Sequence, residues 1–375
     1  SGDIDVDGTT NLDIVDVDVS LTVDGTVKLN GNFPTGTDNI ALGNAALSGG
    51  SLSGAGNIAI GDSVLQNMTS GSNAVAIGRD AMNTGIYTGG DAIAIGRAAL
   101  QNLTTGSNNV AIGGLALTSN TTGPSNTAVG YVALTANTTG TQNVAVGAYA
   151  LDANISSNNS TAIGYSALSL NTGASNTAVG ASAMVDNTSG VNNTAIGVNS
   201  LTNNTTASFN IALGGSSLAA NTTGASNTAV GYTALTANTT ASNSTAVGYQ
   251  ALTANTTGAT NTAFGKGALL ANTTGNTNVA VGANALAANV DGDKSVAVGV
   301  DALAAQDPAS NVDMYNVAVG DSAGKAVTTG TTNTFVGGLA GSSNTTGASN
   351  TAVGMQSFAS NTTGNYNSVL GKYAL

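Results

Sequence analysis

The sequence predicts an all-β fold, a parallel β-roll or β-solenoid of about 20 coils of about 17 residues each. Three observations predict it. A five-residue motif recurs at a nearly constant spacing, each position of the repeat keeps one chemical character, and the composition is poorly suited to helices. With only 7% charged residues and no Glu, few helices would have a solvated outer face.

The recurring motif has the form of Asn143-Val-Ala-Val-Gly147, and we call its last residue the repeat glycine. The spacing between repeat glycines is mostly 17 residues, occasionally 16 or 18, and once 21, between Gly299 and Gly320. A flexible Gly/Ser-rich chain would not keep such a register, so the low complexity is that of one structural coil repeated. The repeat glycines are Gly43, Gly61, Gly78, Gly96, Gly113, Gly130, Gly147, Gly164, Gly180, Gly197, Gly214, Gly231, Gly248, Gly265, Gly282, Gly299, Gly320, Gly337, Gly354 and Gly371.

The residues just before each repeat glycine predict a five-residue β-strand. The position directly before it, the pre-glycine column, is always apolar, as in Val146 and Phe264. The position two before it, the alanine column, is nearly always Ala, with Phe335 and Val369 as departures. Three before it stands Val, Ile or Thr in most coils. Alternation with period 2 and β-branched residues is typical of a strand.

The residues after the repeat glycine predict the rest of the coil. The fourth, the leucine column, is Leu, Met or Phe, as in Leu134, and only Gly324 and Gly341 break it. The seventh is usually Asn, followed by Thr-Thr-Gly as in 138–140, and we expect Asn and Gly there to supply the positive-φ corners of a turn. Each coil would then hold two short strands and two turns.

The packing expected from these columns is a homotrimeric fibre. The pre-glycine and leucine columns would face each other inside the roll, and the alanine column would lie on the opposite face of its strand. A face of small residues lets another backbone approach closely, so we expect a homotrimer with this column toward the shared axis. The alternative is a single solenoid with a weakly hydrated alanine face. The residues assigned to the trimer axis are Ala128, Ala145, Ala229 and Ala246.

Composition excludes several classes of function. The chain has no His, Cys or Trp, and all 19 acidic residues are Asp, so thiolate and imidazole catalysis and the usual zinc or haem ligation are excluded. We expect no enzyme, and no catalytic, cofactor-binding or metal site. The formal charge of −12 argues against a nucleic-acid partner. The absence of about 18 consecutive apolar residues argues against membrane insertion.

Two regions differ in composition. Residues 1–38 form an Asp-rich segment with β-like alternation, and residues 39–375 form the repeat domain. Hard cations favour carboxylates, but the EF-hand spacing and the calcium-binding nonapeptide repeat are absent, so a solvated acidic face is the favoured interpretation.

The motifs Asn57-Ile-Ala-Ile-Gly61, Asn109-Val-Ala-Ile-Gly113 and Asn193-Thr-Ala-Ile-Gly197 resemble the head repeats of YadA-type trimeric autotransporter adhesins, which are similar to repeats in bacteriophage tail fibres. The resemblance covers residues 39–375 and implies a left-handed parallel β-roll that trimerises. The 17-residue period is longer than the repeat typical of that family, which implies a longer outer turn.

These features predict a non-enzymatic structural fibre for extension and attachment, extracellular, on a virion or cell surface. The first expectation is a phage tail fibre or another virion appendage. The alternatives are the head of a bacterial surface adhesin or a secreted extracellular filament, and an ice-binding solenoid. The ice-binding hypothesis requires a flat array of Thr, whereas pairs such as Thr138-Thr139 lie at a turn.

The position directly after the repeat glycine, the post-glycine column, varies from Asp to Arg, Lys and Tyr, which predicts a solvent-facing ridge. Its Tyr and Arg side chains are candidate contacts for a cell-surface glycan or protein receptor, with a merely solubilising ridge as the alternative. The four extra residues around Gln306–Met314 predict a protruding loop. The candidate receptor contacts are Arg79, Arg97, Tyr131, Tyr165, Tyr232, Tyr249 and Tyr315.

Overall fold

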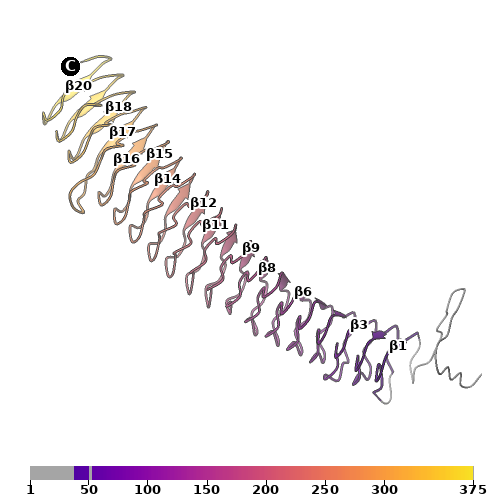
Figure 1. Ribbon diagram of the computed structural model, residues 1–375. Helices are drawn as coiled ribbons and strands as arrows, with labels where there is room; N and C mark the ends of the chain where they lie inside the picture. Colours follow the sequence, from indigo (N-terminus) through magenta and orange to yellow (C-terminus); the bar gives the residue numbers. More distant parts are fainter. Residues whose placement is uncertain (1–37, 50–52, 375) are drawn as a thin grey trace, which may run out of the picture.

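The computed structural model describes residues 38–49 and 53–374, which form a parallel β-solenoid of about 19 turns. The coils stack in chain order along one direction, with the strands along one side of the stack (Figure 1). Except for Asp38, the Asp-rich segment expected at the N-terminus lies outside the described residues.

Each repeat contributes one strand of three residues, which ends directly before the repeat glycine. The strands are β1 (Ile40–Leu42), β2 (Ile58–Ile60), β3 (Val75–Ile77), β4 (Ile93–Ile95), β5 (Val110–Ile112), β6 (Thr127–Val129), β7 (Val144–Val146), β8 (Thr161–Ile163), β9 (Thr177–Val179), β10 (Thr194–Ile196), β11 (Ile211–Leu213), β12 (Thr228–Val230), β13 (Thr245–Val247), β14 (Thr262–Phe264), β15 (Val279–Val281), β16 (Val296–Val298), β17 (Val317–Val319), β18 (Thr334–Val336), β19 (Thr351–Val353) and β20 (Ser368–Leu370).

All neighbouring strands pair in parallel and in register, so that each column of the repeat runs straight along the rod. Ala229 lies opposite Ala246, for example, and Val230 opposite Val247. At about 4.8 Å per spacing, the twenty strands span about 91 Å.

The prediction of a five-residue strand before the repeat glycine, and of a second short strand in each coil, is wrong in detail. In the described coils the rest of the repeat is turns, bends and irregular backbone, with isolated parallel bridges at Ser72–Gly90 and Asp293–Asp313. These turns still bond coil to coil through the backbone, as in the 3.0 Å bond from the Leu235 amide to the Ala251 carbonyl. The stack is therefore held together around its perimeter and not only along the sheet.

The interior of each coil is filled by the alanine and leucine columns. Leu134, Leu168, Leu235 and Leu252 are fully buried, which confirms the predicted interior position of the leucine column. The alanine column lies opposite, in the same apolar cluster. Its assignment to a trimer axis is therefore wrong: in the single chain Ala128, Ala145, Ala229 and Ala246 are each 0% exposed.

The pre-glycine column, expected inside, lies on the outer face of the sheet. Ile112 is 39% exposed, Ile196 43% and Phe264 56%. The physical reason is the width of the coil. Because Leu already projects inward from the opposite wall, the strand wall has room for Ala but not for a second column of Val or Ile.

Two ladders of buried Asn side chains line the interior corners. In the first, Asn126 donates its backbone N–H to Asn109 Oδ1 (2.9 Å) and its Nδ2 to the Gly140 carbonyl (2.8 Å). In the second, Asn137 Nδ2 donates to Asn120 Oδ1 (2.9 Å) and to the same Gly140 carbonyl (3.1 Å). Both ladders satisfy buried polar groups of one coil with those of the next.

The prediction that Asn137 and Gly140 supply positive-φ corners is wrong, because neither residue has a positive φ. In this coil positive φ occurs at Gly130, Val132, Leu134 and Gln142 instead. The bulky Leu134 has φ 52°, a conformation that costs about 1–2 kcal/mol. Full burial of its side chain, worth about 1.5–3 kcal/mol, offsets that cost.

The repeat glycine is required on two grounds, which Gly130 illustrates. Its φ of 140° is open to Gly alone, and a Cβ built there would lie 2.5 Å from the carbonyl oxygen of Gly147 in the next coil. The first position after the strand therefore excludes any side chain.

Candidate functional site

The post-glycine column forms an exposed ridge along the rod. Arg79 and Arg97 are exposed, as are the tyrosines assigned to this ridge. Their exposed fractions are 49% for Tyr131, 59% for Tyr165, 59% for Tyr232 and 47% for Tyr249. Arg79 also contacts its neighbour Asp80, with 3.6 Å between Nε and Oδ2. A part in receptor binding stays a prediction for all of them.

The first aromatic cluster on this ridge contains a residue that the sequence analysis missed. Tyr149 lies two positions after its repeat glycine, and its ring stands edge-on to Tyr131 (centroids 5.8 Å apart) and to Tyr165 (5.9 Å). It fills the place beside Ala148, where the post-glycine column offers only a methyl group. Tyr131, Tyr149 and Tyr165 thus form one row over three successive coils, and such edge-to-face contacts are favourable.

The second aromatic cluster is a stacked pair. The rings of Tyr232 and Tyr249 have centroids 6.1 Å apart and an interplanar angle of 11°. Their stacking follows from the parallel register, because equivalent side chains of successive coils recur at the strand spacing.

The predicted loop around Gln306–Met314 is attached at its C-terminal end by an exposed network of hydrogen bonds among Lys294, Asp313 and Tyr315. Lys294 Nζ lies 2.8 Å from Asp313 Oδ2 and 3.3 Å from the Tyr315 hydroxyl, which donates to the same carboxylate at 3.0 Å. These hydrogen bonds raise the pKa of Lys294 and lower the pKa of Asp313. Tyr315 is 51% exposed, but its hydroxyl and ring are engaged by this network, with Lys294 Nζ 5.3 Å from the ring centroid.

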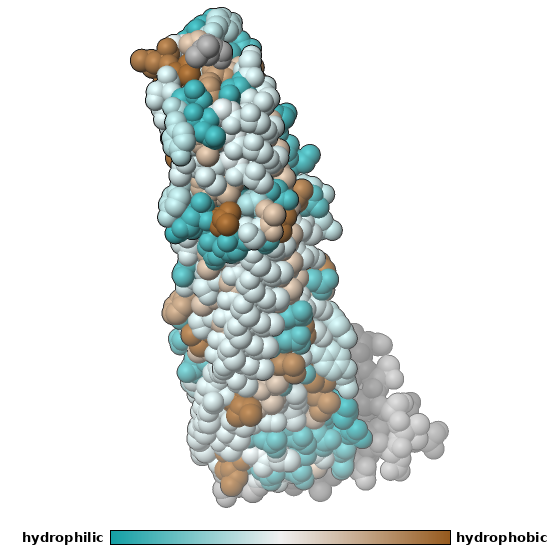
Figure 2. Space-filling view, turned by 90° about the vertical axis from the view of Figure 1, so that its left-hand side faces the viewer, coloured by the Kyte–Doolittle hydropathy of each residue, from teal (hydrophilic) through white to brown (hydrophobic). Residues whose placement is uncertain are grey.

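A second exposed feature is the outer face of the sheet. The pre-glycine column places an aliphatic or Phe side chain on every strand of this face, and the first residue of each strand adds Thr, Val, Ile or Ser beside it. Figure 2 shows one side of the rod, where residues of intermediate hydropathy dominate and strongly hydrophobic or hydrophilic ones are scattered in small groups. On the strand face, by contrast, the pre-glycine column is apolar at every strand.

The second irregular turn, 85–90, keeps its aromatic residue inside. Tyr87 is 0% exposed and packs beside Gly71, where a Cβ would clash with its ring. Burial raises the pKa of its phenol, with a smaller contribution from the charge of Asp91. Tyr87 occupies the corner that the second Asn ladder occupies from Asn120 onward, so its position is structural.

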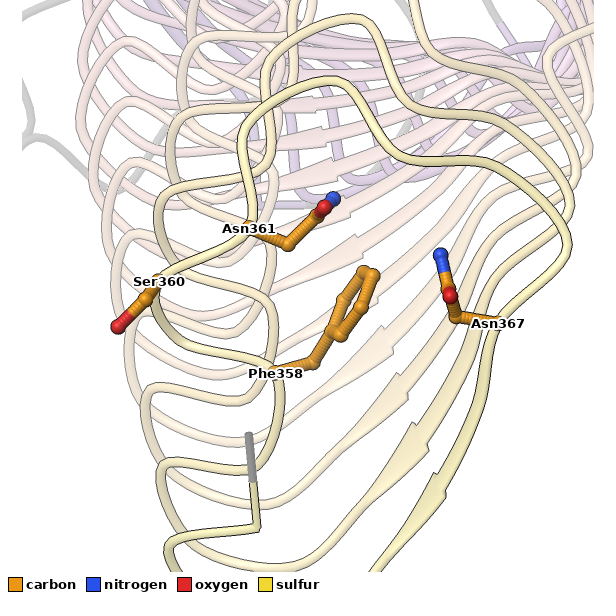
Figure 3. A pocket seen from close by; sticks show the side chains of 4 residues that line it. All are labelled: Phe358, Ser360, Asn361 and Asn367. Atoms are coloured by element: carbon orange, nitrogen blue, oxygen red, sulfur yellow. The ribbon is translucent and has the colours of Figure 1, made fainter.

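A hollow of about 300 Å³ opens at the last coil, lined by Phe358, Ser360, Asn361 and Asn367. Figure 3 shows Phe358, Asn361 and Asn367 pointing into the coil and Ser360 pointing away from it. Asn361 and Asn367 bond to Asn344 and Asn350 of the preceding coil, as members of the two ladders. The hollow is the interior of the roll seen end-on.

Within residues 38–49 and 53–374 we find no group of three or more potential acidic metal ligands. In the same part of the chain no helix has the length and apolar character needed to span a bilayer.

Comparison with known proteins adds no relative: no protein-family model matches the chain, and no curated protein matches it either.

Proposed function

We propose that this chain is a non-enzymatic structural fibre protein, which assembles as a homotrimer and provides reach and attachment on a virion or cell surface. The observation that carries the proposal is the apolar pre-glycine column, which continues along all twenty strands and is exposed or half-buried at every one of them. Contiguous exposed apolar surface of this extent marks a protein contact. A long rod with one apolar side fits a fibre.

The proposed trimer places the outer face of the sheet toward the shared axis. Thr228, Val230 and their equivalents would then meet the same residues of the other two chains at each level. The resemblance to trimeric head repeats supports three chains instead of two. Because the single chain already buries its alanine column, the contact needs no change in the coil itself.

Sedimentation equilibrium tests this assembly. Wild-type protein should sediment as a trimer, and Val230→Lys/Val247→Lys should sediment as a monomer because six lysines would meet at the axis. The matched control is Thr223→Lys/Thr240→Lys, which adds the same charge at exposed turn positions and should leave the trimer intact. A monomeric wild type, or a trimer that tolerates the strand-face lysines, would contradict the proposal.

The same proposal allows two biological contexts for the fibre. The first is a phage tail fibre or related virion appendage, and the alternative is the head of a surface adhesin or a secreted filament. The full-length gene separates them: neighbouring tail genes support the virion, whereas a signal peptide with a membrane anchor supports the adhesin. An electron micrograph of the purified particle would show where along the fibre this protein lies.

An ice-binding solenoid is the second candidate, and one observation favours it. Thr228 and Thr245 lie side by side at the start of their strands, next to the outward Val230 and Val247, so that a column of Thr and a column of Val run side by side on the sheet face. The turn threonines do not form such an array. Thermal hysteresis tests this candidate, which needs the strand face free. A trimer without thermal hysteresis contradicts it.

A further inference from the structure

The two tyrosine clusters on the post-glycine ridge share a feature beyond their aromatic character. In each case the post-glycine position of the preceding coil is a glycine: Gly114 before Tyr131 and Gly215 before Tyr232. The Cδ2 and Cε2 atoms of each ring lie next to these glycines. A Cβ built on Gly114 would be 3.5 Å from Tyr131 Cδ2, and one built on Gly215 would be 3.3 Å from Tyr232 Cδ2.

These glycines are not demanded by the backbone. Neither Gly114 nor Gly215 has a positive φ, unlike the repeat glycine that precedes each of them. Any side chain at these positions would stand beside the first ring of the cluster and cover it. Tyr131 and Tyr232 are approximately half exposed, at 49% and 59%, and no side chain of the preceding coil's post-glycine position stands beside either ring. Each cluster is therefore an aromatic platform that is open on the side of the preceding coil.

The surroundings of both platforms are almost uncharged. From residue 98 to residue 265 the only ionisable residues besides tyrosine are Asp152 and Asp186. The remaining exposed side chains here are mainly hydroxyls, amides and small apolar groups. A strongly charged ligand would find no counter-charges on this stretch, so electrostatic complementarity favours a neutral one.

We propose that the platforms Tyr131–Tyr149–Tyr165 and Tyr232–Tyr249 bind neutral pyranose saccharides, with the sugar ring stacked on the open tyrosine above Gly114 or Gly215. The electron-rich face of a tyrosine attracts the weakly positive C–H groups of a pyranose ring. The neighbouring hydroxyls and amides suit its O–H groups. This inference rests on the proposed attachment function, and it assigns the contact to these platforms instead of to Arg79, Arg97 or the network at Tyr315.

The test uses the full chain with three neutral hexasaccharides, maltohexaose, cellohexaose and laminarihexaose, and a heparin hexasaccharide as the charged counterpart. Binding is followed by calorimetry and by tyrosine fluorescence, which is free of tryptophan background because the chain has no Trp. At least one neutral sugar should bind, and the heparin fragment should not.

Two kinds of variant locate the site. Gly114→Thr/Gly215→Thr covers both rings while every tyrosine is kept, and it should weaken binding at least about tenfold, the loss expected for a central contact. Gly338→Thr is the matched control, at the equivalent position of a coil that is followed by Met355 and not by Tyr, and it should bind as wild type. Tyr131→Ser/Tyr232→Ser should lose binding to the same extent as the double glycine variant.

Absence of binding to all three neutral sugars overturns the inference, and so does preference for heparin or unchanged binding in both double variants. Sedimentation of the same proteins keeps the two proposals apart. A variant that loses sugar binding but still sediments as a trimer tests the platform proposal alone. A protein that sediments as a monomer but binds sugar normally contradicts the proposed assembly alone.

Discussion

Phe335 occupies the space that Gly341 leaves empty. Phe335 is the one aromatic residue of the alanine column, and Gly341 is one of two glycines in the leucine column. A Cβ built on Gly341 would lie 2.5 Å from Phe335 Cε1, and one on Gly324, in the preceding coil, 2.9 Å from Cδ2. The ring is fully buried. The large side chain thus enters from the strand wall, and the two small residues stand where leucine enters elsewhere.

This pairing predicts a strong dependence on Phe335. Phe335→Ala should lower the free energy of unfolding of its region by about 3–5 kcal/mol, because it opens a cavity between two coils that lack leucine. Adding Gly324→Leu and Gly341→Leu should restore most of this loss by rebuilding the regular coil. Hydrogen exchange of β17 to β19 provides the measurement. If the triple variant is no better protected than Phe335→Ala, the two columns do not share one space.

The same relation should be transferable to a regular coil. Ala229→Phe alone overpacks the interior, at a cost of about 1–3 kcal/mol or more, whereas Ala229→Phe with Leu218→Gly and Leu235→Gly reproduces the arrangement around Phe335. Thermal unfolding should place the triple variant above the single one. The opposite order would show that the arrangement around Phe335 depends on features peculiar to its own coils.

This relation also explains which part of the fold could be predicted from sequence. The period, the strand position and the parallel register follow from the repeat itself. Strand alternation defines two faces, but Ala and Val are both apolar, so the pattern alone does not say which face is inside. The exceptions to the repeat do distinguish the two faces. Phe335 in the alanine column coincides with Gly324 and Gly341 in the leucine column, and only columns that share an interior need such compensation.

The site was predicted in part for a similar reason. The post-glycine position identified four exposed tyrosines, but Tyr149 stands one position later and joins them only because its ring reaches back beside Ala148. The role of Asn was misjudged because turn chemistry describes one coil at a time. Asn137 bonds to its equivalent Asn120, a contact that exists only between stacked coils.

The Asn ladder should be sensitive to interruption. Asn221 donates to Asn204 Oδ1 (3.0 Å) and accepts from Asn238 Nδ2 (2.8 Å). Asn221→Leu should cost about 1–3 kcal/mol, because it leaves buried amide groups without partners. The control is Val327→Leu, at a coil where the equivalent position is naturally apolar, and it should be nearly neutral. Protection factors around each site, compared with wild type, measure both effects; equal losses would contradict a role for the hydrogen bonds.

Tyr87 should tolerate loss of its hydroxyl. Within the described part of the chain its Oη is buried without a hydrogen-bond partner, so the hydroxyl is held at a desolvation cost. Tyr87→Phe should therefore leave stability unchanged or raise it by about 1 kcal/mol, whereas Tyr87→Ala should lower it by about 3–5 kcal/mol. Thermal unfolding distinguishes the two, and a marked loss in Tyr87→Phe would reveal a hydroxyl contact of importance to the fold.

The pinning of the 306–314 loop should depend on pH at both extremes. The pKa of Asp313 is lowered by its hydrogen bonds to Lys294 and Tyr315, so its stabilising contribution is present above the ordinary carboxyl value of 3.8 and is lost as pH falls through the folded-state pKa. The pKa of Lys294 is raised, so its contribution is present below 10.5 and is lost as pH rises through its folded-state pKa. The amides of Asp293 and Met314, which bond to Val312 and Asp293, report whether the loop is attached. Their protection factors, measured against those of β13, should hold between about pH 4 and pH 10 and fall on either side, by a small amount because the pair is exposed. In Lys294→Gln the alkaline step should disappear and the acid step should shrink, because only the hydrogen bond from the Tyr315 hydroxyl then lowers the pKa of Asp313. If the variant keeps the wild-type profile, some other group attaches the loop.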